Sequence, residues 1–274
     1  MLLYRNILFT SGLNPRQYTK AEEIGADFGV VNLEDPVPPE HKAASRAAAL
    51  SFFEREHALP YGLVINSLRD AYGFQDVVAL ADSAARPDLV FLPKIESPEE
   101  LRILEDVLAP RLPNLRLAVI IESVRGLQAV DEIARATPRM AALAFGAADC
   151  AAELRVEVGW ESLLYARSRI VAAAANAGIA CFDSPYFRLQ DLEGLERECR
   201  GARQLGFTGK LSIHPRHIPV INSVFGPSPQ AVAYARAVIA ACEQNEGGIA
   251  VVDGNMVGPP FVTIARRILA VAGA

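Results

Sequence analysis

The strongest constraint in this sequence is a regular alternation of short apolar runs with longer segments that have helical spacing. Eight apolar runs recur roughly every 25–40 residues, a spacing typical of repeated strand–helix units. We expect strands at Asn6–Thr10, Phe28–Leu33, Leu63–Asn66, Leu89–Pro93, Leu117–Ile121, Ala142–Phe145, Ala180–Phe182 and Lys210–Ile213. The helix-patterned segments between and after them include His41–His57, Pro98–Leu108, Gly126–Ala136, Trp160–Ala177 and Leu189–Leu205.

These eight units predict an α/β protein with a (β/α)8 TIM barrel. The expected strands are almost continuously apolar, which suits parallel strands that are buried on both faces. An open, doubly wound sheet is the alternative. The first strand is followed by Thr10-Ser11-Gly12-Leu13-Asn14 in place of a glycine-rich phosphate-binding turn, and this favours the barrel.

The chain has room for a barrel and an additional segment. A barrel of this type takes about 250 residues, and the chain has 274. We expect a barrel domain in residues 1–226 and a tail in residues 227–274 that caps the barrel or a neighbouring subunit. The tail pattern predicts a helix at Pro229–Gln244, an extended piece at Ile249–Val252 and a last helix near Thr263–Val271.

Charge and composition argue against several classes of partner. The chain has 27 basic and 32 acidic side chains, whereas general nucleic-acid binders carry a basic excess. No uncharged apolar stretch reaches the about 18 residues of a membrane span, so we expect no membrane partner. The four cysteines are scattered without a CxxC pair, which predicts reduced thiols and a cytoplasmic protein.

Carboxylates follow most of the expected strands, at the end of a barrel where active sites are built. They are Glu34, Asp35, Glu96, Glu122, Asp149 and Asp183. Six converging acids repel one another, so they predict a hard cation such as Mg2+, and the scarcity of histidine and cysteine argues against zinc. The alternative for any single acid is a helix cap or an ion pair with a nearby base.

Three other residues near strand ends carry chemically useful groups. His214 is a candidate base, but the sequence favours a structural, hydrogen-bonded histidine. Cys150 has no evident base beside it, so we expect it to pack in the core. Lys94 stands among carboxylates that should raise its pKa, so we expect an ion pair rather than a Schiff-base nucleophile.

Several motifs occur in a fixed order along nearly the whole chain. They are Leu33-Glu34-Asp35, Lys42 with Arg46, Pro93-Lys94-Ile95-Glu96-Ser97, Ile121-Glu122-Ser123, Phe145-Gly146-Ala147-Ala148-Asp149, Gly206-Phe207-Thr208-Gly209-Lys210 with Ile213-His214-Pro215, and Gly254-Asn255-Met256-Val257. Together they resemble the citrate lyase beta-subunit-like (CitE-like) branch of the HpcH/HpaI aldolase/citrate lyase superfamily. Each motif alone is weak, and the set is specific.

The resemblance implies a lyase that depends on Mg2+, with Mn2+ as an alternative ion, and acts on acyl-CoA thioesters of hydroxy acids. It implies that the metal ligands are Glu122 and Asp149. Water and substrate oxygens would fill the remaining metal positions.

The other candidate site residues fall into three groups. We expect proton transfer by Glu34 and Asp35, and substrate binding by Asn66, Arg69 and Lys94. The candidates for binding the phosphate-bearing CoA are Arg5, Lys42 and Arg46, with Arg16 and Lys20 as further basic residues in the same part of the chain.

Two departures from the family pattern affect these expectations. Relatives commonly carry an Arg-x-Asn motif after strand three, whose arginine binds the substrate carboxylate. Here the stretch is Val64-Ile65-Asn66, and Arg69 is either a replacement or a solvated loop residue. Relatives also commonly carry an aspartate after Met-Val or Met-Ile in the tail, which a neighbouring subunit lends for proton transfer. Here that position is Gly258, which cannot titrate.

The leading hypothesis is cleavage of citramalyl-CoA to pyruvate and acetyl-CoA. Alternatives are a citryl-thioester lyase of a citrate lyase complex, a malyl-CoA-type lyase, and an aldolase for free oxo acids. From another class, the two departures are compatible with a non-catalytic or reduced-activity metabolite- or CoA-binding subunit, against which Glu122 and Asp149 argue. The resemblance also implies a homo-oligomer, a trimer or hexamer, in which the tail covers a neighbour's barrel mouth.

Overall fold

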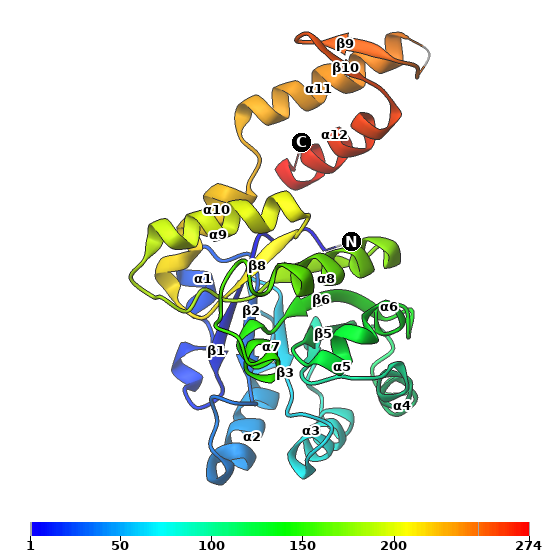
Figure 1. Ribbon diagram of the computed structural model, residues 1–274. Coiled ribbons are helices and arrows are strands. Elements are labelled where there is room, and N and C mark those ends of the chain that lie inside the picture. The colour runs from blue at the N-terminus through cyan, green and yellow to red at the C-terminus, as the bar shows by residue number, and fades with distance from the viewer. Residues whose placement is uncertain (1, 246, 274) are drawn as a thin grey trace. The chain divides into compact units, whose positions relative to one another are not determined.

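Eight parallel strands close into a barrel in the computed structural model, which confirms the predicted (β/α)8 TIM-barrel fold (Figure 1). The structure describes residues 2–245 and 247–273; positions 1, 246 and 274, which the predicted domain ranges include, lie outside the described residues. The strands pair in chain order and β1 also pairs with β8, so the sheet closes on itself. They are β1 (Asn6–Ser11), β2 (Gly29–Asn32), β3 (Tyr61–Val64), β4 (Leu89–Leu92), β5 (Leu117–Ile121), β6 (Met140–Phe145), β7 (Ala180–Asp183) and β8 (Gly209–Ser212).

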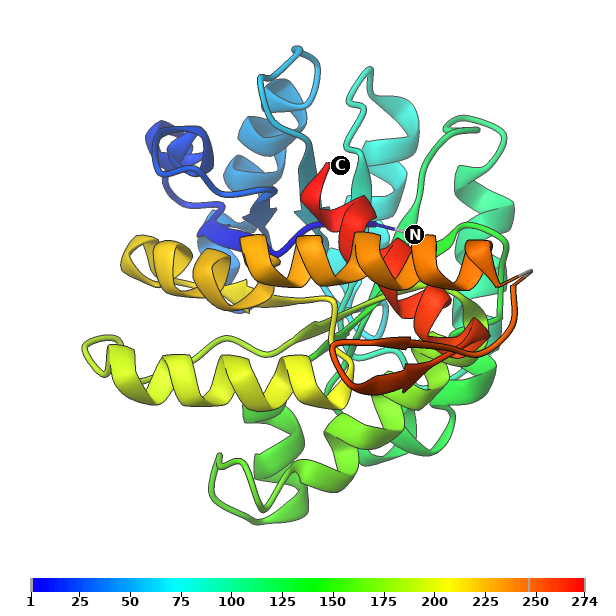
Figure 2. The same cartoon turned by 90° about the horizontal axis from the view of Figure 1, so that it is seen from above.

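Helices surround these strands, and the view in Figure 2 shows them as a ring from blue to yellow. They are η1 (Pro15–Gln17), α1 (Lys20–Glu23), η2 (Pro39–His41), α2 (Lys42–Phe52), α3 (Ala71–Asp82), α4 (Pro98–Leu108), α5 (Val124–Gln128), α6 (Val130–Ile133), α7 (Ala147–Leu154), α8 (Leu164–Ala177), α9 (Leu192–Leu205), η3 (Pro215–His217) and α10 (Ile218–Phe225). Among the described residues, no helix is both long and apolar enough to cross a membrane.

The barrel interior is filled by alternate side chains of the strands. Large residues such as Phe28, Phe91 and Phe182 pack in one cluster with small residues such as Ala118 and Ala144. Large and small side chains on neighbouring strands fill the space together, as in other barrels of this size. The interior is therefore a packed core, and any ligand space must lie at its mouth.

All eight strands occur where apolar runs predicted them, and β3 shows the largest shift. It begins at Tyr61 and ends at Val64, two residues earlier than expected at each end. Asn66 leaves the ladder because its backbone N–H and its side-chain amide both donate to Asp76 Oδ2, at 2.8 and 2.6 Å. A polar partner on the following helix therefore ends this strand.

The chain divides into two compact units, residues 1–222 and 223–274. The second unit contains the end of α10, then α11 (Pro229–Gln244), a hairpin of β9 (Ala250–Val252) and β10 (Asn255–Val257), and α12 (Pro259–Ala272). Its own small core includes Ala235, Val238, Cys242, Val252 and Val257. The tail therefore has the helix, extended piece and last helix expected from its pattern, with β10 as an additional strand.

The four cysteines, Cys150, Cys181, Cys199 and Cys242, are all buried and free. Burial raises the pKa of Cys150 to about 11 and that of Cys199 to about 12. These thiols pack as small apolar groups, as expected for Cys150.

Candidate active site

A cavity of about 570 Å³ lies at the carboxyl ends of the barrel strands, where TIM barrels carry their active sites. Its polar lining residues are Thr10, Ser11, Asn32, Glu34, Asp35, Glu122 and Asp149. Its other lining residues are Phe9, Pro36, Ile120, Phe145, Gly146, Ala147, Ala148, Pro185, Phe187, Leu211 and Ile213. The two predicted metal ligands and the two predicted proton-transfer residues therefore share one cavity.

Glu122 directly follows β5, and residues after the neighbouring strands β4 and β6 determine where its carboxylate lies. The backbone N–H of Lys94, after β4, donates to Glu122 Oε1 at 2.8 Å. Lys94 adopts a left-handed φ of 55°, which costs a non-glycine residue free energy and is kept where the surroundings require it. On the other side lies Gly146, where a Cβ atom would stand 2.5 Å from Glu122 Oε2. Glycine is therefore needed at the end of β6 for Glu122 to take this position.

Asp149 lies in the first turn of α7, directly after β6. The N-terminal N–H groups of a helix have no intrahelical acceptor, and those of Ala147 and Ala148 belong to residues that line the cavity. Gly146, the residue before this helix, provides no side-chain cap. The first two residues of α7 therefore line the cavity beside its carboxylates, and the N-terminus of a helix suits an anionic oxygen.

The pair Glu122 and Asp149 fits a hard divalent cation. Glu122 is buried, and burial together with repulsion from Glu34 and Asp149 raises its pKa to about 8. A carboxylate in this position gains from a positive partner at neutral pH. The described lining of the cavity includes no histidine or cysteine, and carboxylate oxygens are the ligands that Mg2+ prefers.

Two protein carboxylates leave most of an octahedral coordination shell to other oxygens. Across residues 2–245 and 247–273, no group of three or more His, Cys, Asp or Glu side chains is arranged to hold a metal ion. Water and a chelating substrate would therefore have to complete the shell of a Mg2+ ion at Glu122 and Asp149.

Glu34 and Asp35 lie near Lys94 at the cavity. Lys94 Nζ is 2.6 Å from Glu34 Oε1 and 3.3 Å from Asp35 Oδ1. Burial alone would lower the pKa of Lys94, but these ion pairs outweigh it and the pKa lies above its usual value. Burial raises the pKa of Glu34, against the influence of Lys94. Lys94 is thus a charged, ion-paired ammonium group, as its carboxylate neighbours predicted.

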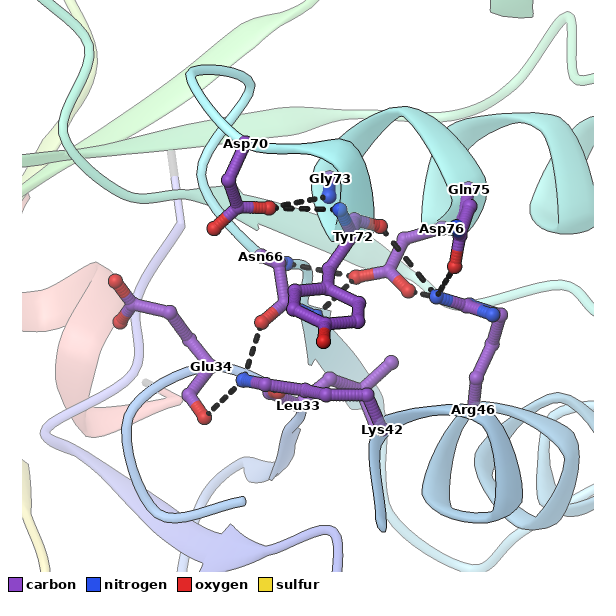
Figure 3. A network of polar contacts seen from close by, with 10 residues as sticks. All are labelled: Leu33, Glu34, Lys42, Arg46, Asn66, Asp70, Tyr72, Gly73, Gln75 and Asp76. Carbon is purple, nitrogen blue, oxygen red and sulfur yellow. Dashed lines mark hydrogen bonds and ion pairs between the residues drawn. The ribbon is translucent and has the colours of Figure 1, made fainter. Parts of the chain in front are cut away.

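Lys42 is a buried clamp between the ends of β2 and β3 (Figure 3). Its Nζ donates to the backbone carbonyls of Leu33 and Glu34 at 2.8 and 2.7 Å, and to Asn66 Oδ1. Glu34 gives its backbone carbonyl to this network, while its carboxylate lies apart from the ammonium group. Lys42 therefore fixes the backbone from which Glu34 reaches the cavity.

Arg46 and Asp76 extend the same network on α2 and α3. Arg46 Nε is 2.5 Å from Asp76 Oδ1, and Asp76 Oδ2 accepts both hydrogen bonds from Asn66. Lys42, Arg46 and Asn66 therefore all have protein partners here. Their predicted contacts with CoA or substrate remain predictions.

Arg69 and Arg5 lie in other surroundings. Arg69 pairs with Glu96 at 2.6 Å and Glu100 at 2.9 Å, and its side chain is 46% exposed. Arg5 precedes β1, at the end of the barrel opposite the cavity, and pairs with Asp27 at 2.6 Å. Neither residue belongs to the described lining of the cavity.

The expectation that six carboxylates converge is wrong for two of them. Glu96 is engaged by Arg69 outside the cavity lining. Asp183 is fully buried, 2.9 Å from Arg167 and 2.6 Å from Lys210. Their positions at strand ends do not distinguish these two acids from the four that line the cavity. The basic partners that engage them, Arg69, Arg167 and Lys210, are distant in the sequence.

His214 has the structural role that the sequence favoured. Its Nδ1 accepts a hydrogen bond from the backbone N–H of Arg216 and so caps η3. His214 does not belong to the described lining of the cavity.

Sequence reasoning missed several lining residues. Thr10 and Ser11 end β1, and Asn32 ends β2, so the strand-end rule that selected the acids also applied to them. Asn32 Oδ1 accepts the backbone N–H of Glu34 at 2.8 Å and thereby helps to place it. The apolar lining gives no signal in the sequence, because such residues look like any other strand residue.

Several known proteins are similar to this chain over nearly its full length. The citrate lyase subunit beta of Leuconostoc mesenteroides subsp. cremoris is 32% identical over 99% of this chain and 94% of its own length. A (3S)-malyl-CoA thioesterase of Cereibacter sphaeroides is 33% identical over 99% of this chain and 95% of its own length. CitE from Mycobacterium tuberculosis, solved with magnesium, acetoacetate and coenzyme A, is 31% identical with a TM-score of 0.83, covering 99% of both chains.

The family model for HpcH/HpaI aldolase/citrate lyase matches residues 5–215, which include every strand of the barrel. The citrate lyase subunit beta, the malyl-CoA thioesterase and the CitE structure extend the likeness over nearly the full chain. This chain belongs to the HpcH/HpaI aldolase/citrate lyase family.

Proposed function

We propose that this protein is a Mg2+-dependent carbon–carbon lyase that cleaves a hydroxyacyl-CoA thioester, with citramalyl-CoA as the substrate and pyruvate and acetyl-CoA as products. The observation that carries the proposal is the placement of Glu122 and Asp149, from adjacent strand ends, in one cavity with Glu34 and Asp35. The CitE relative solved with magnesium and coenzyme A supports the same ion and carrier.

The reaction is a retro-aldol cleavage that needs no oxidant or reductant. The substrate hydroxyl loses its proton, and the bond between the hydroxyl-bearing carbon and the thioester CH2 breaks. The electron pair of that bond passes to the thioester as an enolate, and protonation of the CH2 carbon gives acetyl-CoA. Mg2+ bound at Glu122 and Asp149 supplies Lewis-acid stabilisation of the negative charge on the oxo-acid side.

The side chains have separate tasks in this scheme. Glu34 accepts the hydroxyl proton at its carboxylate, and Lys94 holds that carboxylate in position through its ion pair. Asp35, whose side chain is 66% exposed, exchanges protons with solvent. The N–H groups of Ala147 and Ala148 stabilise an oxyanion at the start of α7.

The phosphates of CoA need cations near the same end of the barrel. Arg16 and Lys20 lie in η1 and α1, directly after the carboxyl end of β1. Arg16 is exposed and makes no ion pair within the described part of the chain, and Lys20 has only the surface partner Glu23. These two residues suit the phosphates better than the other three candidates. Lys42 and Arg46 are engaged by protein partners, and Arg5 lies at the opposite end of the barrel.

The test is an assay of citramalyl-CoA cleavage with separate detection of acetyl-CoA, pyruvate and free CoA. We expect acetyl-CoA and pyruvate in equal amounts with Mg2+ and none after EDTA treatment. Glu122→Gln and Asp149→Asn should each lower the rate by about 10³-fold, because they remove several kcal/mol of metal-mediated stabilisation. Glu99→Gln, on the exposed face of α4, is the matched control and should keep full activity.

Full activity in EDTA-treated protein would overturn the metal assignment. Release of free CoA with an intact hydroxy acid would identify a thioesterase instead of a lyase. Binding of the thioester without any turnover would support the non-catalytic alternative.

A further inference from the structure

A second cavity, of about 830 Å³, lies between helix α9 and the segments that follow β6 and β7. We call it the α9 cavity, because one face of this helix forms a wall with Gly194, Arg197, Glu198, Gly201 and Gln204. It shares Ala148, Pro185 and Phe187 with the active-site cavity, so the two cavities are neighbours. The proposed metal ligands and proton-transfer residues do not belong to its described lining.

Two glycines on α9 leave room for two aromatic side chains in the lining. A Cβ atom at Gly194 would lie 2.1 Å from the Tyr186 hydroxyl, and one at Gly201 would lie 2.7 Å from the Trp160 ring. The Tyr186 hydroxyl donates to the N-cap residue of α9 at 2.7 Å. The guanidinium carbon of the buried Arg167 lies 4.9 Å from the centre of the Trp160 ring. Both rings are therefore held at the cavity, where a planar ligand ring can pack against them.

Arginines are the main charged groups at the α9 cavity. Arg188, Arg197 and Arg200 line it and are exposed. Arg188 makes no ion pair with the residues that the structure describes. Arg197 and Arg200 have only surface partners on the same helix, Glu193 at 4.0 Å and Glu196 at 2.5 Å. Exposed pairs of this kind contribute little free energy, so an anionic ligand can replace them.

Two carboxylates also line the α9 cavity. Glu198 lies 2.7 Å from the buried Lys210 ammonium and 3.8 Å from Arg167, so its charge is already balanced. Glu161 is exposed. The lining has four arginines against these two glutamates, whereas the active-site cavity has four carboxylates and no basic residue in its described lining. Of the two cavities, the α9 cavity is therefore the one that suits an anion in the absence of a metal ion.

We propose that the α9 cavity binds a nucleoside diphosphate, with its base against Trp160 and Tyr186 and its phosphates at Arg188, Arg197 and Arg200. The aromatic rings suit a planar base, and the planar guanidinium groups form paired hydrogen bonds with phosphate oxygens. This site is separate from the position after β1 that we propose for the phosphates of CoA.

The test is a titration of the full-length protein with ADP in EDTA, which removes metal ions that could hold a phosphate at the active site. Trp160 is the only tryptophan in the sequence, so tryptophan fluorescence reports on this cavity, and calorimetry gives the affinity. We expect ADP to change the fluorescence. It should bind at least about 10-fold more tightly than adenosine or pyrophosphate, because each of these lacks one of the two groups that the cavity recognises.

A variant tests the phosphate contacts. The Arg200 side chain is 65% exposed, so Arg200→Gln leaves the core intact. This variant should weaken ADP binding by about 10-fold, because it removes a charge-assisted hydrogen bond to phosphate. Arg102→Gln is the matched control, since Arg102 also belongs to an exposed ion pair within one helix, on α4, and should leave ADP binding unchanged.

The outcomes separate this site from the proposed lyase function. Absence of ADP binding, or equal weakening in Arg200→Gln and Arg102→Gln, would overturn the site. Pyrophosphate binding as tight as that of ADP would overturn the contact with the base. Displacement of ADP by CoA would assign the cavity to the substrate and overturn an independent site. None of these measurements involves turnover, so failed nucleotide binding leaves the lyase function in place, and absent cleavage with intact ADP binding overturns the lyase function alone.

Discussion

Two residues beside the cavity, Gly146 and Lys94, determine the position of the Glu122 carboxylate. Gly146 and Lys94 bring no catalytic group to the cavity themselves, yet both fix Glu122: one by lacking a side chain and one through its N–H. The sequence places Glu122 and Asp149 at the same end of the barrel, because Glu122 directly follows β5 and Asp149 lies in the short segment after β6. The surroundings of Asn66, Arg69 and Arg5 could not be predicted, because their partners Asp76, Glu96 and Asp27 are set by tertiary packing.

Gly146→Ala should weaken Mg2+ binding by about 10–100-fold, the range seen when a group that orients a metal ligand is disturbed. The new methyl group would collide with Glu122 Oε2 and push this carboxylate away. Calorimetric Mg2+ titration measures the effect. Gly159→Ala is the control, since its Cβ would lie 3.2 Å from the Ser162 hydroxyl and 3.9 Å from the Glu157 carbonyl oxygen. Unchanged Mg2+ affinity in Gly146→Ala would remove the link between this glycine and the metal.

Gly258 should slow proton transfer at the methyl carbon of acetyl-CoA, because this position supplies neither a base for condensation nor the matching acid for cleavage. Removing a proton from the methyl group of acetyl-CoA requires a base, and a positioned base contributes about 10²–10⁴ in rate. Gly258 has an extended backbone with φ of −166°, and a Cβ would lie 3.7 Å from Ile249, so Asp can be accommodated. Gly258→Asp should therefore raise the rates of cleavage and of condensation of acetyl-CoA with pyruvate together, because both directions pass through the same proton transfer.

The measurements are the rates of cleavage and of condensation in the variant and in the isosteric control Gly258→Asn, whose amide cannot accept the proton. If Gly258→Asp raises neither rate above that of Gly258→Asn, another residue carries out this proton transfer.

At the scale of elements, buried ionic groups tie neighbouring strands and helices together. Lys42 joins the ends of β2 and β3 to α2, and Asp183 joins β7 to α8 and β8. The helices α4 and α11 have the bounds that the sequence predicted, since each begins with a proline after a serine cap position. The sequence pattern does not predict α3 and α7. Gly73 lowers the helical propensity of the α3 segment, and α7 is only 8 residues long.

Lys42→Met should lower the free energy of unfolding by at least about 1.5–3 kcal/mol, the contribution of one hydrogen bond to a charged group. Three acceptors at the ends of β2 and β3 would lose their donor. Urea denaturation measures the change, with Lys20→Met as an exposed control. Equal stabilities of the two variants would mean that Lys42 is not a structural clamp.

Asp183 should make stability sensitive to acid. Burial raises its pKa, but Lys210 and Arg167 lower it more, so the folded-state pKa lies below the usual value. A depressed folded pKa gives stability that is present above the unfolded pKa of about 3.9 and is lost as the pH falls through the folded pKa.

Asp183→Asn should therefore cost about 3–5 kcal/mol at neutral pH, because Lys210 keeps a buried charge. The variant should also lose less stability than the wild type between about pH 5 and pH 3. Urea denaturation over this range tests both effects, and Asp131→Asn, a partly exposed pair with Arg169, is the control. Parallel pH curves for wild type and Asp183→Asn would contradict the assignment.

At the scale of the whole molecule, the second unit has several large apolar side chains that are exposed. Ile249, Val251, Met256, Phe261 and Ile264 are between 47% and 70% exposed. Val251 and Met256 are paired across the β9–β10 hairpin, and large exposed apolar patches mark contacts with other chains. This surface supports the homo-oligomer that the family resemblance implies.

We expect light scattering at micromolar concentration to give a mass of three or six chains. Met256→Lys with Val251→Lys should lower that mass, because two charges would enter an apolar interface. Phe74→Lys, on the exposed face of α3, controls for added charge elsewhere. A monomeric mass for the unmodified protein would contradict the expectation.

The burial of all four cysteines has a practical consequence for labelling. Their thiols are shielded, and burial raises the pKa of Cys150, Cys199 and Cys181, so little thiolate is present at neutral pH. A maleimide dye or spin label would therefore leave the native thiols of the folded protein largely unmodified. One cysteine introduced at an exposed position, such as Tyr165, can thus serve as a selective attachment point without first replacing the natural ones.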